Sequence, residues 1–246
     1  MRLDRLLSNL GYGSRKEMTA AIRNGWVTMD GADVTDPAFP VPLDRARGVR
    51  LDGEVIDPPP PMAVMLHKPA GYTCSHNDLG ALVYDLLPDR WRIRKPLLST
   101  VGRLDKESTG QLLLTDDGDL LHRITHPRSH ATKHYRVVLR DPLRGDEAAL
   151  FGAGGFLMNG DARPLKPASW VPEGPASGVM VLDEGRYHQI RRMFETLGNL
   201  VVSLHRFRTG GLDLGDLPEG AWRFLEGGDL TAIFTSQEPI FQSPAI

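Results

Sequence analysis

The sequence has 246 residues, enough for one large domain or for a small domain followed by a medium-sized one. Its 41% hydrophobic and 24% charged residues are ordinary for a globular protein, and no apolar run approaches the roughly 20 residues that span a bilayer. Arg2, Asp4 and Arg5 break the apolar stretch that a secretion signal would need, and the single Cys74 excludes an internal disulfide, so we expect a cytoplasmic protein with no membrane partner.

The charge is distributed unevenly, although the net charge is only −2. Between Arg90 and Arg140 there are 11 Lys/Arg against 5 Asp/Glu, and between Arg186 and Arg208 five arginines stand against Glu195 alone. Local potential rather than net charge attracts a polyanion, so these stretches are compatible with nucleic-acid binding. They are equally compatible with arginines that simply face solvent.

Residues 1–57 predict a small unit of two helices and a hairpin. Leucines at positions 3, 6, 7 and 10 recur at helical spacing, and Ser14 with Glu17 forms a capping-box signature for a second helix. The Asp30-Gly31 pair between short apolar runs predicts a β-hairpin.

Two short helices with a basic second helix, packed on a hairpin, resemble the S4 RNA-binding domain. This resemblance implies RNA contacts for the basic side chains of the unit, which are Arg2, Arg5, Arg15, Lys16 and Arg23. A protein-docking module is the alternative interpretation of the same pattern.

Four prolines at positions 58–61 predict a stiff linker, and residues 62–236 predict a second, sheet-rich domain of the α+β class. A C-terminal tail, 237–246, follows. Apolar runs or alternating patterns predict strands at 63–66, 112–115, 135–139 and 179–182, and Asp117-Gly118 predicts a turn after the second of these. Apolar residues at positions 190, 193, 194 and 197 predict a helix over 187–197.

The segment 102–115 contains the most informative candidate for chemistry. Asp105 lies in a glycine-bounded loop directly before a buried apolar run, and catalytic groups often lie on loops held by a rigid strand. Taken alone, Asp105 would also suit an ordinary turn.

Four motifs, in one order along the chain, resemble the RsuA branch of pseudouridine synthases. They are Lys68-Pro69-Ala70-Gly71-Tyr72, the run from Gly102-Arg103-Leu104-Asp105 to Leu112-Leu113-Leu114-Thr115, Lys133-His134-Tyr135, and the segment 184–194. With the S4-like start, the resemblance covers nearly the whole chain. Gln111 and Ser108 depart from the family pattern, which puts local packing in doubt more than activity.

The resemblance implies a mixed, sheet-rich catalytic domain that converts uridine to pseudouridine in ribosomal RNA. It makes Asp105 the essential carboxylate, Tyr135 the aromatic partner of the uracil, and Arg191 the cation paired with Asp105. Further substrate contacts are expected from Leu182, Lys133, Arg192 and Arg103, the last as a planar group that fills the gap left by an extruded base. The reaction involves no redox change and transfers no external group, so we expect no cofactor and no metal.

Helical geometry separates the two neighbouring arginines of the segment 187–197. At 100° per residue, Arg192 lies opposite the apolar stripe and should face water, whereas Arg191 lies on the flank of the stripe and can reach a site at the core edge. Without the motif, Arg191 would suit a surface position and Tyr135 plain core packing.

Segments 124–127, 187–189, 204–206 and 210–211 most resemble the enzymes that modify uridine 516 of 16S rRNA. We therefore expect a monomer that acts on 16S rRNA or on a small-subunit assembly intermediate. Three alternatives stay open: a synthase for 23S rRNA, a non-catalytic S4-type ribosome-binding factor, and a retaining glycosidase with Glu107 as the second carboxylate.

Histidines recur at every fourth position at 122, 126, 130 and 134. Histidines at this spacing on a helix can bind zinc. Pro127 interrupts the segment and Tyr135 belongs to a predicted strand, so no single helix should carry all four. We predict no metal site here.

Overall fold

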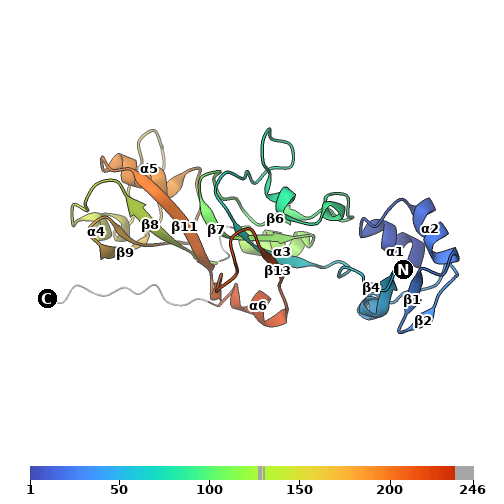
Figure 1. Cartoon of the computed structure of the whole chain (residues 1–246). Helices are drawn as coiled ribbons and strands as arrows, with labels where there is room; N and C mark the ends of the chain where they lie inside the picture. Colours follow the sequence, from blue (N-terminus) through green and yellow to red (C-terminus); the bar gives the residue numbers. More distant parts are fainter. Residues whose placement is uncertain (127–128, 130, 236–246) are drawn as a thin grey trace.

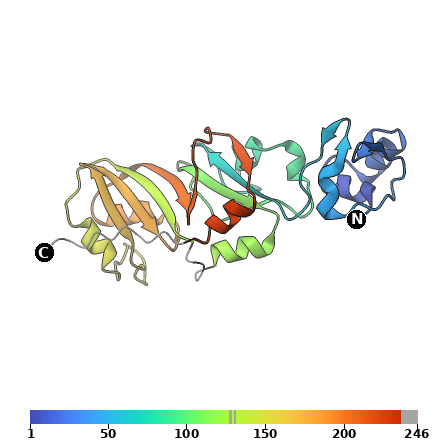
Figure 2. The ribbon, with the colours of Figure 1, turned by 90° about the horizontal axis from the view of Figure 1, so that it is seen from below.

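The computed structural model describes residues 1–126, 129 and 131–235, so His130 and the expected tail 237–246 lie outside the described residues. An N-terminal unit lies at one end, and the rest of the chain forms a long sheet with helices against it (Figures 1 and 2). None of the helices in the described part of the chain is long and apolar enough to cross a bilayer.

The N-terminal unit packs two helices on a small sheet. Its helices are α1 (Leu3–Asn9) and α2 (Arg15–Arg23). The predicted leucines lie in α1 and directly after it, and they are buried in the core of the unit. The capping box is confirmed: the Ser14 hydroxyl accepts from the Glu17 backbone N–H, and the Glu17 carboxylate accepts from Ser14 N–H at 2.7 Å.

The sheet of this unit has the order β2-β1-β3-β4 and contains a second hairpin that we did not predict. Its strands are β1 (Val27–Met29), β2 (Ala32–Asp33), β3 (Val49–Leu51) and β4 (Glu54–Val55), and the 3-10 helix η1 (Leu43–Gly48) precedes β3. The second hairpin turns at Asp52-Gly53, the same dipeptide signal as Asp30-Gly31, and both aspartates have positive φ.

Several specific contacts fix the N-terminal unit to the second domain. The Asp57 carboxylate accepts from Arg90 at 2.6 and 2.8 Å and from the Trp91 indole at 2.7 Å. The Lys95 N–H donates to the Asn9 carbonyl at 2.7 Å. A side chain at Gly11 would collide with the Arg90 carbonyl, 2.1 Å from an ideal Cβ, so this close approach requires glycine.

Within the described residues, the second domain is built on a nine-stranded sheet with the order β13-β5-β7-β11-β8-β10-β9. Strand β6 pairs with β7, and β12 with β11. The strands are β5 (Ala63–Lys68), β6 (Ser99–Thr100), β7 (Thr109–Thr115), β8 (Lys133–Leu139), β9 (Ser169–Gly174), β10 (Ser177–Leu182), β11 (Val201–Thr209), β12 (Leu212–Asp213) and β13 (Trp222–Phe224). Four of these contain the predicted strands.

The sequence predicted one helix of this domain, over 187–197, and the structure contains others in the described residues. The helices are η2 (Val83–Leu86), η3 (Asp89–Arg92), α3 (Gly118–Thr125), α4 (Glu147–Gly152), α5 (Gln189–Thr196) and α6 (Gly227–Ala232). Asp117-Gly118 is not a simple turn: the Asp117 side chain accepts from two backbone N–H groups and caps α3. Helix α5 starts two residues later than predicted because His188 adopts a left-handed conformation.

Two hydrophobic cores meet at Tyr135. One lies between α5 and the strands β8, β10 and β11, where the predicted stripe buries Ile190, Met193 and Phe194. The other lies along β5 and β7 and includes Leu112 and Leu114. Tyr135 packs against both cores, so it marks the junction of the two halves of the sheet.

Candidate active site

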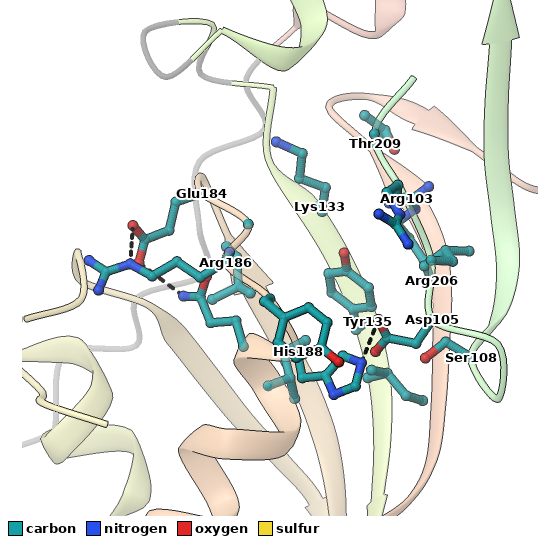
Figure 3. Close-up of a pocket in the computed structure, with 18 of the residues that line it drawn as sticks. Arg103, Asp105, Ser108, Lys133, Tyr135, Glu184, Arg186, His188, Arg206 and Thr209 are labelled. Carbon is teal, nitrogen blue, oxygen red and sulfur yellow. Dashed lines mark hydrogen bonds and ion pairs between the residues drawn. The ribbon is translucent and has the colours of Figure 1, made fainter. Parts of the chain in front are cut away.

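A pocket of about 630 Å³ opens at the junction of the two halves of the sheet (Figure 3). Its walls come from the loop that precedes β7, from β8, β10 and β11, and from the segment that leads into α5. Of the residues predicted to form the site, Arg103, Asp105, Lys133, Tyr135 and Leu182 line this pocket.

Gly110 brings the loop with Asp105 close to β11. Strands β7 and β11 run parallel here, with Gly110 opposite Arg206. Gly110 has φ +106°, and a Cβ would lie 2.1 Å from the Arg206 carbonyl oxygen, so no other residue fits without movement of the backbone. The Arg206 guanidinium Nε donates in turn to the Gln111 carbonyl at 2.7 Å.

The buried Lys68 side chain stabilises the same loop through hydrogen bonds to backbone carbonyls. Its Nζ donates to the carbonyl oxygens of Pro69, Lys106 and Ser108 at 2.9, 3.0 and 2.7 Å, which satisfies all three of its N–H bonds. Burial lowers the pKa of Lys68. Lys68 thus links the end of β5 to the part of the loop that directly follows Asp105.

The Asp105 carboxylate lies between two side-chain nitrogens, one from α5 and one from the residue before it. His188 Nε2 is 3.5 Å from one carboxylate oxygen, and Arg191 Nε is 3.8 Å from the other. Figure 3 shows His188 directed at Asp105 beside Tyr135. Sequence reasoning assigned no role to His188, although the residue belongs to the 184–194 motif.

The structure separates Arg191 from Arg192 in a way that only partly matches the helical argument. Arg191 reaches Asp105, the Val201 carbonyl at 3.0 Å and the Ser108 hydroxyl at 3.5 Å. The prediction that Arg192 faces water is wrong. Arg192 pairs with Asp161 and donates to the Asn159 carbonyl at 3.0 Å, because the loop before β9 packs over that side of α5.

Tyr135 and Arg206 are cross-strand neighbours on β8 and β11, and both line the pocket. Tyr135 is half-buried, whereas Arg206 is 4% exposed. Sequence reasoning did not single out Arg206. Its position on an ordinary alternating strand carries no signal that distinguishes it from a surface arginine.

Lys133 and Arg103 add positive charge to the pocket from opposite sides. Burial, together with the nearby Arg206, lowers the pKa of Lys133 to about 8. Arg103 is exposed at the pocket wall and is therefore accessible to a ligand. The pocket combines the Asp105 carboxylate, paired with His188 and Arg191, with the positive charges of Lys133, Arg103 and Arg206, which suits an anionic substrate.

The two departures from the family pattern are both buried side chains that contact neighbouring elements. Ser108 is buried, and its hydroxyl lies within reach of Arg191. Gln111 is fully buried, and its amide donates to the Leu212 carbonyl at 2.8 Å. The amide thus contacts the β11–β12 hairpin.

The five basic residues of the N-terminal unit are all exposed, but they are not equivalent. Arg2 and Arg15 both bind the buried Asp4 carboxylate, at 3.0 and 3.1 Å. Part of their charge therefore offsets that carboxylate. Arg5, Lys16 and Arg23 are exposed without an ion pair among the residues that the structure describes.

Glu107, the second carboxylate weighed in the sequence, is exposed and is not among the residues that line the pocket. His122 lies in α3, His126 directly after it and His134 on β8, and no group of three metal-binding side chains occurs in the described ranges. Glu184, another carboxylate of the pocket, is held by Gln189 at 2.9 Å and lies 3.6 Å from Arg186.

Comparisons with known proteins agree with this geometry. The family model for RNA pseudouridylate synthase matches residues 63–169, and the S4 domain model matches residues 1–44. Ribosomal small subunit pseudouridine synthase A of Vibrio cholerae serotype O1 is 37% identical over 235 residues, and the Escherichia coli K12 protein of the same name is 39% identical over 238 residues. Each alignment covers 95% of this chain and 100% of the relative.

A crystal structure of a pseudouridylate synthase is also similar, with 34% identity and a TM-score of 0.65. The match covers 95% of this chain and 99% of that chain. Identity above 30% over full-length relatives places both the S4 unit and the pocket domain in a known family. The chain belongs to the pseudouridine synthase family, and its catalytic domain follows an S4 domain.

Proposed function

We propose that this protein isomerises a uridine of small-subunit ribosomal RNA, uridine 516 of 16S rRNA, to pseudouridine. The relatives named for the small ribosomal subunit support the choice of RNA. The observation that carries the proposal is the Asp105 carboxylate held by His188 and Arg191 beside Tyr135. We further propose that the enzyme acts as a monomer in the cytoplasm, on free 16S rRNA or on an assembly intermediate, without a cofactor.

The reaction breaks the N1–C1′ bond of uridine, turns the detached uracil and joins C5 to C1′. The C5 proton must then be removed. A carboxylate next to the sugar and base is therefore required, and Arg191 would keep a positive charge beside Asp105 when substrate displaces water. Tyr135 and Leu182 would contact the two faces of the uracil while it turns.

The target uridine must leave its stack before it can reach Asp105. Extrusion costs a few kcal/mol, and contacts with the flipped nucleotide offset this cost. Lys133 and Arg206 would bind the phosphates next to the flipped nucleotide. Arg103 would stack in the vacated position, because a planar guanidinium can pack against bases.

An assay on four RNAs tests the proposal. Pseudouridine should form at position 516 in 16S transcripts or in small-subunit assembly intermediates and not in 23S transcripts or large-subunit intermediates, with Asp105→Asn as the negative control. Modification confined to 23S rRNA would replace the proposed target. Binding of the RNA with no modification on any of the four would favour a non-catalytic ribosome-binding factor.

A further inference from the structure

Tyr187 presents a large aromatic ring to solvent at the pocket. The residue is 76% exposed, and it lines the same pocket as Asp105. No hydrogen bond to its hydroxyl occurs among residues 1–126, 129 and 131–235. Such exposure of an aromatic side chain beside a buried, charged pocket marks a surface that a ligand can cover.

The Tyr187 ring is held in a fixed orientation by its neighbour. It stacks on the His188 ring with centroids 3.8 Å apart and planes 16° apart. His188 in turn lies 3.5 Å from Asp105 and has φ +51°, a left-handed conformation that residues other than glycine seldom adopt. One face of Tyr187 is therefore covered by His188, and the stack leads from the carboxylate to the surface.

We propose that Tyr187 is a stacking platform for the nucleobase directly next to the target uridine. The inference rests on the proposed function, because it assumes that the pocket receives a flipped uridine. A nucleotide flipped to Asp105 leaves its chain neighbours at the edge of the pocket, where Tyr187 lies. The free face of an aromatic ring binds a nucleobase by stacking, with little dependence on the base.

An exposed positive charge of the same pocket also fits an RNA backbone. Lys106 lines the pocket and is exposed, so it can meet a backbone phosphate beyond those that Lys133 and Arg206 would bind. Arg186, by contrast, is tied to Asp161 at 3.2 Å and to the Arg163 carbonyl at 2.7 Å. Tyr187 is thus an exposed aromatic ring on a pocket whose lining also includes the exposed Lys106.

The test compares three enzymes on three RNAs. Wild type, Tyr187→Ala and Tyr187→Phe are each measured for dissociation constant and single-turnover rate. The RNAs are an intact 16S fragment with the target uridine and two fragments with an abasic nucleotide directly 5′ or directly 3′ of the target. Val171→Ala, an exposed apolar residue on β9 outside the pocket, controls for loss of surface area.

On the intact RNA, Tyr187→Ala should weaken binding at least about five-fold, and Tyr187→Phe should restore affinity to within about two-fold. On one of the two abasic RNAs, the wild-type enzyme should lose affinity by a similar factor relative to the intact RNA. Tyr187→Ala should bind that abasic RNA no more weakly than it binds the intact RNA. That pattern identifies the stacked base and its side of the target.

Two results would overturn the inference. One is that Tyr187→Ala binds the intact RNA as tightly as the wild-type enzyme does. The other is an equal loss for Tyr187→Ala on all three RNAs, which would mean that the ring only orients His188. Failure of the proposed function is seen separately, as wild-type enzyme that forms no pseudouridine on the intact fragment.

Discussion

Asp105 shows how one side chain depends on donors from distant parts of the chain. The loop motif and the family resemblance predicted Asp105 and its pairing with Arg191, and the two groups lie 3.8 Å apart. His188 was not predicted, because its left-handed backbone, which turns the ring toward Asp105, cannot be deduced from the letters of a helical motif. Arg206 and Lys68 were missed because burial of a cation depends on tertiary packing.

Asp105→Asn should abolish isomerisation, with a loss of about 10⁴-fold or more in single-turnover rate, because the amide lacks the negative charge and the basicity of the carboxylate. RNA affinity should change little. Rate and dissociation constant are measured on the same 16S fragment. Turnover near the wild-type rate would rule out the proposed role of Asp105.

Arg191→Ala should lower the single-turnover rate on the order of 100-fold, because it removes a donor to Asp105 and the contact to Val201. Arg192→Ala is the matched control from the same helix. It should lower the free energy of unfolding by about 1–2 kcal/mol through loss of the contacts with Asp161 and Asn159, with turnover unchanged. The reverse ranking of the two rates would exclude Arg191 as the partner of Asp105.

Lys133 should make RNA binding depend on pH above neutrality. Its pKa is about 8, so the pocket loses this charge as pH rises through 8, and affinity should fall between pH 7 and 9. The free energy of unfolding should rise over the same range, since the lysine of the unfolded chain, with a pKa of about 10.4, binds the proton more tightly.

Lys133→Arg retains the charge at all these pH values. Its affinity for the 16S fragment should therefore stay level from pH 7 to 9. A pH dependence of affinity that persists unchanged in this variant would show that another group titrates.

At the scale of elements, strands with clear alternation and the amphipathic α5 were predicted, and elements set by capping or by tertiary contacts were not. Tyr135, Val137 and Leu139 share a face of β8 as expected. Helix α3 was missed because Asp117-Gly118 suits a turn equally well until the aspartate is seen to cap a helix. The parallel contact of β7 with β11 joins segments about 95 residues apart, which a local pattern cannot indicate.

The junction of β5 with the Asp105 loop gives a prediction at this scale. Lys68→Met should lower the free energy of unfolding by about 1–3 kcal/mol, because the buried Ser108 carbonyl loses its donor and the partly buried Pro69 and Lys106 carbonyls each lose one hydrogen bond. The rate should fall as well, since the loop that positions Asp105 is released. Chemical denaturation and single-turnover assays measure the two effects.

Lys95→Met is the control, because Lys95 is an exposed lysine outside the pocket. Its stability should stay within about 0.5 kcal/mol of wild type. If Lys68→Met were as stable and as active as this control, Lys68 would not hold the loop.

At the scale of the whole molecule, the S4 unit and the catalytic domain were both predicted from the sequence, and their contact was not. The proline run suggested a simple spacer. Asp57 instead binds Arg90 and Trp91, and Gly11 lies against Arg90. This contact depends on a glycine without a Cβ and on one buried carboxylate. Neither produces a periodic pattern of apolar residues, so the sequence of neither domain predicts the contact.

Removal of residues 1–56 should leave a catalytic domain that folds, binds RNA less tightly and keeps activity at high RNA concentration. The deletion ends before Asp57 so that Arg90 and Trp91 keep their partner. Because each lost phosphate contact lowers the salt slope of log affinity by about 0.7 to 0.9, the truncated protein should show a shallower salt dependence.

A full-length variant tests the same phosphate contacts without removal of the N-terminal unit. Arg5, Lys16 and Arg23 are exposed, whereas Arg2 and Arg15 offset the buried Asp4, so only the first three can be replaced without destabilising α1. Replacing the three by alanine should reduce the slope by about two units if each contacts a phosphate. An unchanged slope in both proteins would mean that residues 1–56 do not hold the RNA backbone. Docking to a ribosomal protein would then be the better account of this unit.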